Sequence, residues 1–170
     1  MKLPLRVVVL ATALGALLVT TMPAQSSPSL EDTLNWLKDF LPNATGAEGR
    51  TGGFTQRATT SLEVMDGCRV RLTHDKVTNG QHFRDAEEFS LGDVDPATAN
   101  VGAQENGAFR VDMFTRGGSK TVTRTQEWDG FREKVSYVEG GVFFSERGSA
   151  ERVAKAYAHA ADLCGEAQPF

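Results

Sequence analysis

Two of the three histidines lie close together in a segment that alternates apolar and polar residues. His74 and His82 flank an Asn79-Gly80 pair that is typical of a tight hairpin turn. Histidines on facing strands can bind a metal ion, but a convincing site needs a third or fourth ligand at suitable spacing. The third histidine, His159, has no nucleophile or acid partner that the sequence identifies. We therefore predict no catalytic, cofactor-binding or metal-binding residue, and no cofactor.

Two further motifs resemble ligand sites and fail on spacing. Asp93 and Asp95 suggest calcium, but an EF-hand loop counted from Asp93 would need Gly and Glu where Thr98 and Gln104 stand. A Gly-Gly-Ser-Lys run at 117–120 lacks the glycine spacing of a phosphate-binding loop. The motifs of serine hydrolases, β-lactamases and zinc proteases do not occur either. The sequence thus favours a non-catalytic protein, with a hydrolase of unknown type as the less favoured alternative.

Cys68 and Cys164 are the only cysteines. In an oxidising compartment, an even count of cysteines indicates a disulfide rather than a metal site or a catalytic thiol. A closed loop of this length is worth about 4–5 kcal/mol in the chain-entropy model. The alternative is two free, buried thiols. We predict the Cys68–Cys164 disulfide.

Residues 1–26 have the organisation of a secretory signal peptide. Lys2 and Arg6 are followed by an uncharged, mostly apolar run over residues 7–22, and Ala24 and Ser26 are small residues at the positions that a signal peptidase reads. The apolar run is shorter than the roughly 20 residues of a membrane span, although an uncleaved anchor is the alternative. We expect export to the periplasm or the extracellular space, with no membrane association after cleavage.

The remaining 144 residues carry 16 basic and 22 acidic side chains, a net charge of −6. This length suits one domain with a real core. An acidic domain is a poor match for nucleic acid or anionic lipid through its overall field. We expect no nucleic-acid partner, and the sequence does not indicate an oligomeric state.

Residues 27–53 are expected to form an amphipathic helix and a Gly-rich linker. Ser29 is a suitable N-cap, and Leu30, Leu34, Leu37 and Leu41 recur at helical spacing. Pro42 is expected to end the helix.

Residues 54–145 alternate apolar and polar side chains in short runs separated by turn pairs. This pattern predicts an antiparallel meander of about seven strands that curls into a barrel or strongly bent sheet, or into a sandwich. A final helix follows, with Ser149 as the expected cap and with Val153, Tyr157 and Cys164 on one face.

Adjacent Phe143 and Phe144 must point to opposite faces of a strand. One of them then needs cover from the N-terminal helix or from a partner. We predict a possible interaction surface at Phe143 and Phe144.

Several strands followed by one C-terminal helix resemble the layout of pleckstrin-homology-like (PH-like) domains. The Phe89–Asp95 segment, FSLGDVD, looks like a strand-ending segment common in that group, and residues 150–165 are similar to the last helix of small uncharacterised bacterial exported proteins. The resemblance implies an α+β fold in which residues 54–170 form the PH-like domain. The runner-up is a lipocalin, although neither Trp36 nor Trp128 lies in the Gly-x-Trp setting of that family.

These features predict an exported, non-catalytic binding or interaction domain. Its expected partner is an unknown protein, bound through a peptide segment, or a small apolar molecule, held at a sheet edge or barrel mouth. The alternative is a lipocalin-like carrier with a central cavity for a small hydrophobic ligand.

Overall fold

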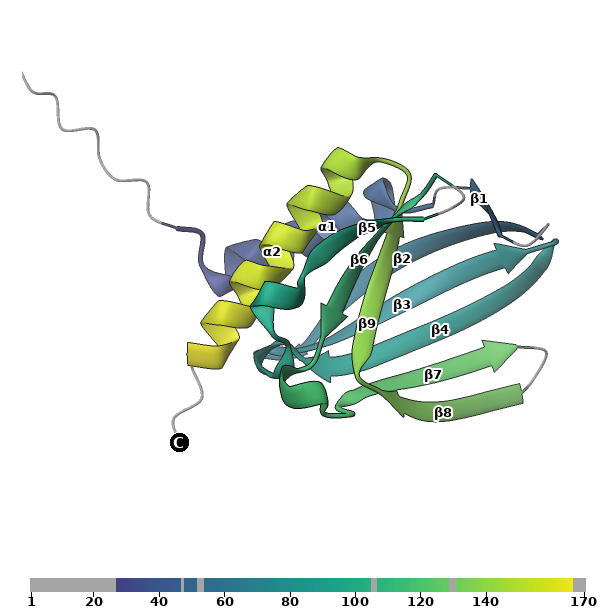
Figure 1. Cartoon of the computed structure of the whole chain (residues 1–170). Helices are drawn as coiled ribbons and strands as arrows, with labels where there is room; N and C mark the ends of the chain where they lie inside the picture. Colours follow the sequence, from purple (N-terminus) through teal and green to yellow (C-terminus); the bar gives the residue numbers. More distant parts are fainter. Residues whose placement is uncertain (1–26, 47, 52–53, 105–106, 129–130, 167–170) are drawn as a thin grey trace, which may run out of the picture.

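The computed structural model describes residues 27–46, 48–51, 54–104, 107–128 and 131–166, so the expected signal peptide, 1–26, lies outside the described residues. These residues form an α+β fold with two antiparallel sheets and a C-terminal helix (Figure 1). The helices and strands are α1 (Leu30–Ala44), β1 (Glu48–Thr51), β2 (Phe54–Asp66), β3 (Arg69–Thr78), β4 (Gln81–Ser90), β5 (Asn100–Ala103), β6 (Phe109–Phe114), β7 (Val122–Trp128), β8 (Phe131–Tyr137), β9 (Glu139–Phe144) and α2 (Arg147–Glu166). Three 3-10 turns, Leu91–Asp93, Pro96–Thr98 and Arg116–Gly118, join strands.

The larger sheet has the strand order β1-β2-β3-β4-β7-β8, and the smaller sheet has the order β5-β6-β9. Strands β2, β3 and β4 are long, follow one another in the sequence and lie side by side in the larger sheet. The turn between β3 and β4 uses Asn79 and Gly80, whose φ angles of 50° and 82° are the positive values that a two-residue hairpin turn requires. The antiparallel prediction is thus confirmed for this part of the chain.

The predicted simple meander is wrong beyond β4. The β5–β6 hairpin leaves for the small sheet, β7–β8 returns to lie beside β4, and β9 crosses to pair with β6. Only Val138 separates β8 from β9, so a single residue turns the chain from one sheet to the other. Alternation of apolar residues identifies strands but does not choose their neighbours. The described strands therefore form two sheets rather than one closed barrel.

Helix α1 begins with a reciprocal capping box between Ser29 and Asp32. Its buried face holds Leu34, Leu37 and Leu41, as the periodicity predicts. The expected end at Pro42 is corrected by the structure, because the helix continues to Ala44. Pro42 lies inside the last turn, and Thr45 ends the helix by donating its N–H to the Leu41 carbonyl. The expected Gly-rich linker also contains β1, which pairs with β2.

Helix α2 starts at Arg147, so Ser149 lies inside its first turn and not at the cap position. Val153, Tyr157 and Cys164 are buried on one face, as predicted. Cys164 forms a disulfide with Cys68, between β2 and β3, and the two Cα atoms are 5.8 Å apart. Figure 1 shows both helices gathered at one end of the large sheet, from which its strands extend away. In the described part of the chain, no helix has the length and hydropathy that a bilayer crossing requires.

Candidate functional site

The inner face of the large sheet changes character along its strands. Val70 and Phe89 are direct cross-strand partners and share a face, and Val122 lies on the same face because it precedes Thr123, the partner of Glu88. These three residues form a fully covered end near the helices. At the other end of the strands, Trp128 is half-buried and Phe131 is 68% exposed. The sheet therefore carries a closed, apolar end and an open end where aromatic side chains reach solvent.

A cleft opens where β4 and β7 separate. The β4–β7 ladder runs from Glu88 opposite Thr123 to Arg84 opposite Glu127 and includes no further described pair. Strand β4 nevertheless continues to Gln81 as a partner of β3, and β7 continues to Trp128 as a partner of β8. The ends of the two hairpins thus lie apart, as Figure 1 shows, and a pocket of about 550 Å³ lies there. We call it the hairpin cleft.

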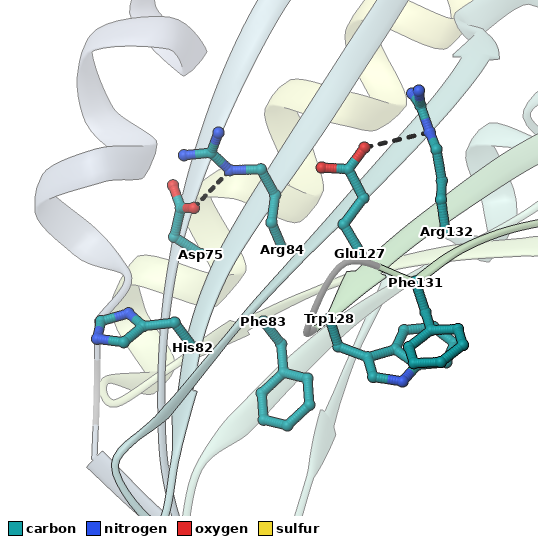
Figure 2. Close-up of a pocket in the computed structure, with 8 residues that line it drawn as sticks. All are labelled: Asp75, His82, Phe83, Arg84, Glu127, Trp128, Phe131 and Arg132. Atoms are coloured by element: carbon teal, nitrogen blue, oxygen red, sulfur yellow. Dashed lines mark hydrogen bonds and ion pairs between the residues drawn. The ribbon is translucent and has the colours of Figure 1, made fainter.

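Two kinds of side chain line the hairpin cleft (Figure 2). On one side of the sheet, oppositely charged neighbours form a row across four strands. Asp75 accepts from Arg84 at 2.8 Å, and Glu127 accepts from Arg132 at 3.1 Å. Because these groups are exposed, the ion pairs contribute little to stability. They do offer a ligand alternating donors and acceptors.

On the opposite side, three aromatic side chains gather. Figure 2 shows Phe83, Trp128 and Phe131 pointing away from the charged row. The rings of Trp128 and Phe131 are stacked, with centroids 6.4 Å apart and planes inclined by 24°. Single exposed apolar residues are common on protein surfaces, whereas a cluster around one opening marks a binding site. Chemically, the cleft combines an aromatic platform with hydrogen-bonding groups.

A second polar cluster is buried between the sheets. Glu87 of β4 accepts from Arg124 Nε at 2.8 Å and from the Gly141 N–H of β9 at 3.3 Å. His74 Nδ1 is 3.0 Å from the Thr60 hydroxyl, and His74 Nε2 is 3.8 Å from Glu87 Oε2. Burial opposes ionisation of Glu87, but the neighbouring His74 and Arg124 outweigh it and hold the pKa of the carboxyl below its ordinary value. Glu87 therefore links the two sheets as a carboxylate.

The order hydroxyl, imidazole, carboxylate in this cluster resembles the arrangement of a catalytic triad. However, the Thr60 side chain is only 1% exposed. Nearby, burial and then the charge of Glu87 raise the pKa of Tyr157, whose hydroxyl stays protonated. A nucleophile must reach its substrate, so we interpret the cluster as a structural contact between the sheets.

The structure separates the three histidines that the sequence analysis considered as possible ligands or bases. His74 is buried on the inner face, whereas His82 pairs with Val77 and lies on the outer face, so the two histidines do not face each other. His159 is hydrogen-bonded to the Pro28 carbonyl at 2.8 Å. Among the described residues, no group of three or more metal-ligating side chains is positioned to hold an ion.

At the predicted interaction surface, Phe144 is buried in the core and only Phe143, 38% exposed, remains at the surface. The Arg110 guanidinium lies over the Phe143 ring, 5.5 Å from its centroid. Strand alternation turns Phe144 inward between the sheets and leaves Phe143 outward, so the two rings lie on opposite faces as expected for adjacent strand residues. The core of the domain covers Phe144, and Arg110 covers part of Phe143.

The hairpin cleft itself was not predicted from the sequence. A usable signal existed, because Trp128 and Phe131 flank an Asp129-Gly130 turn pair, which lies outside the described residues, and such flanking residues become cross-strand neighbours. Phe83 can be assigned to the same cluster only when β4 is known to lie beside β7. Local alternation of apolar and polar residues does not predict that strand pairing.

Comparison of this chain with family models, with curated proteins and with solved structures gives no match. The functional argument therefore comes from the fold and the side chains.

Proposed function

We propose that this protein is an exported, non-catalytic binding domain, and that its hairpin cleft holds an extended peptide segment of a partner protein. The observation that carries the proposal is the 68% exposure of Phe131 beside Trp128, at an opening between two hairpins. An apolar side chain of the partner would lie against this aromatic pair.

The backbone around the cleft favours a peptide as the ligand. Between Gln81 and Phe83, β4 is paired with β3 on one side and with no described strand on the other. Every second N–H and C=O of such a strand points away from its partner and can bind an added strand. The charged row from Asp75 to Arg132 carries equal numbers of both signs, which suits a mixed-charge peptide.

The carrier alternative is less well supported. A lipocalin-like carrier needs a cavity between its sheets. Here large side chains fill that space, including Leu72, Met113, Phe144 and Tyr157, each at most 1% exposed. The open hairpin cleft, outside this core, is the better site for a ligand.

We also propose that the domain is a PH-like variant with a strongly bent sheet. Antiparallel sheets followed by a C-terminal helix are compatible with that layout. An experimental structure whose large sheet has a strand order other than β1-β2-β3-β4-β7-β8 would contradict the proposed PH-like arrangement.

Selection from a random phage-displayed dodecapeptide library on residues 27–170 tests the proposed function. Selected peptides should carry an aromatic or branched apolar residue among mixed charges. Their affinity, measured by calorimetry, should fall at least tenfold on Phe131→Ala, since a central aromatic hot spot is typically worth about 2 kcal/mol or more and about 1.4 kcal/mol is tenfold.

Two other exposed phenylalanines provide matched controls. Phe114, on β6, is 39% exposed and lies away from the hairpin cleft, and Phe114→Ala should leave binding unchanged. Loss of binding on Phe143→Ala instead of Phe131→Ala would place the site at β9 and overturn the proposal. So would a library that yields no peptide binding above background.

A further inference from the structure

A second pocket lies between the two helices, on a part of the molecule that the proposed function does not use. It has a volume of about 540 Å³ and is lined by Trp36 and Thr33 of α1 and by Ala156 and His159 of α2. We call it the helix groove. Its residues come from the elements that pack at the closed end of the large sheet.

The walls of the helix groove are largely apolar. Trp36 is 38% exposed and stacks on Phe40, with ring centroids 4.5 Å apart. Ala156 of α2 also lines the groove, with a small apolar side chain. An exposed indole next to an alanine forms a surface that fits a narrow hydrocarbon chain.

The charges at the groove rim are unbalanced. Arg152 and Lys155 both line it, and among the described residues neither has a carboxylate within ion-pair distance. Asp32 is the acid at the rim, and its Oδ2 accepts a hydrogen bond from the Ser29 hydroxyl at 2.6 Å in the α1 cap. The Arg152 guanidinium lies over the Phe40 ring, 4.8 Å from its centroid. It also donates within its own helix to the Gly148 carbonyl at 3.3 Å and to the Ser149 hydroxyl at 3.4 Å, so its contacts leave its charge without a carboxylate. Two cations are thus available to an anion in an otherwise acidic protein.

We infer that the helix groove binds a single-chain anionic amphiphile, such as a free long-chain carboxylate. The alkyl chain would lie along Trp36 and Ala156, and the carboxylate would bind between Arg152 and Lys155. A guanidinium can bind a carboxylate through two parallel hydrogen bonds, and an ammonium adds a point charge. The combination of an apolar wall with unpaired cations supports a monomeric lipid anion over a neutral ligand.

The two tryptophans of the chain make the site directly testable, since one lies in each pocket. In Trp128→Phe, Trp36 is the sole indole. Sodium dodecanoate, titrated below its micelle concentration, should shift the Trp36 emission to the blue with saturation. Affinity should rise from decanoate to tetradecanoate, by up to about fourfold per added CH₂. In Trp36→Phe, the Trp128 emission should not move.

Charge variants separate this site from non-specific adsorption. Arg152→Glu/Lys155→Glu in the Trp128→Phe background should weaken dodecanoate binding at least tenfold, and Arg152→Gln/Lys155→Gln should give an intermediate loss with the native circular dichroism spectrum. Lys38→Glu reverses a single charge on α1, outside the groove, and should have less than a twofold effect.

Three results would overturn the inference. One is equal affinity for dodecyltrimethylammonium, which has the same chain and the opposite charge. Another is unchanged dodecanoate binding in both double variants. The third is a Trp36 shift with phosphatidylglycerol vesicles but not with monomeric dodecanoate, which would make the groove a membrane contact.

Discussion

Glu87 shows how one side chain can connect two sheets. It lies on the inner face of β4, is 3% exposed, and binds both Arg124 of β7 and the backbone of β9. A buried carboxylate is expensive to desolvate, and it is tolerated here because each of its oxygens has a donor. Glu87 thus joins β9 to the large sheet through the Gly141 N–H.

Removing that carboxylate should be strongly destabilising. We predict that Glu87→Ala lowers the free energy of unfolding by about 3–5 kcal/mol, because Arg124 and the Gly141 N–H lose their acceptor. The neighbouring Glu88→Ala should cost under about 1 kcal/mol, since the Glu88 pair with Arg71 is partly exposed. Urea unfolding at pH 7 measures both, and equal losses would contradict the assigned role.

The same residue makes stability depend on pH. The folded-state pKa of Glu87 lies below its ordinary value of 4.5, so the unfolded chain binds the proton more readily. Stability from this group is therefore fully present above pH 4.5 and is lost as the pH falls through the folded-state pKa. Urea midpoints should fall more steeply between pH 5 and pH 3 in the wild type than in Glu87→Gln. Parallel profiles for the two proteins would remove Glu87 as the cause.

Sequence alone could not identify this residue. Asp85 and Glu87 alternate with Arg84 and Glu88 along β4, so that both faces of the strand read as polar. Only the aromatic residues Phe83 and Phe89 at the same parity indicate which face is internal. By contrast, the Cys68–Cys164 pair was predictable, because a disulfide needs only two cysteines and a suitable compartment.

At the scale of elements, α2 is held to the sheet by its small, apolar face and by one covalent bond. Its last buried residue is Cys164, and its partner Cys68 lies 96 residues earlier. Cys68→Ser/Cys164→Ser should lower the free energy of unfolding by about 2–5 kcal/mol, mainly because the unfolded chain gains freedom. Thermal unfolding of the oxidised and the dithiothreitol-reduced wild type measures the same quantity. No difference between these two samples would argue against a disulfide in the native protein.

The helices and strands can largely be predicted from the sequence, but the pairing between distant strands cannot. Leucines at helical spacing predicted the buried face of α1, and Asn79-Gly80 predicted the turn between β3 and β4. The placement of β7 beside β4 depends on long-range pairing that alternation does not specify. Because the hairpin cleft exists only through that placement, the candidate site was missed while most of its strands were predicted.

At the scale of the whole molecule, the two sheets and two helices leave one end of the large sheet open. Residues such as Leu72, Phe144 and Tyr157 pack the interior and stabilise the fold. Binding is therefore expected outside the core, at the hairpin cleft and the helix groove, which lie on different elements. The two proposed ligands, a peptide and an amphiphile, would therefore occupy separate sites.

Hydrogen–deuterium exchange of the protein with and without a library-selected peptide tests the central claim most directly. Binding in the hairpin cleft predicts new protection of backbone amides at the Gln81 end of β4 and at the Phe131 end of β8. Amides of β9 around Phe143 should exchange at unchanged rates. Protection confined to β9, or no change in β4 and β8 at saturating peptide, would contradict the account.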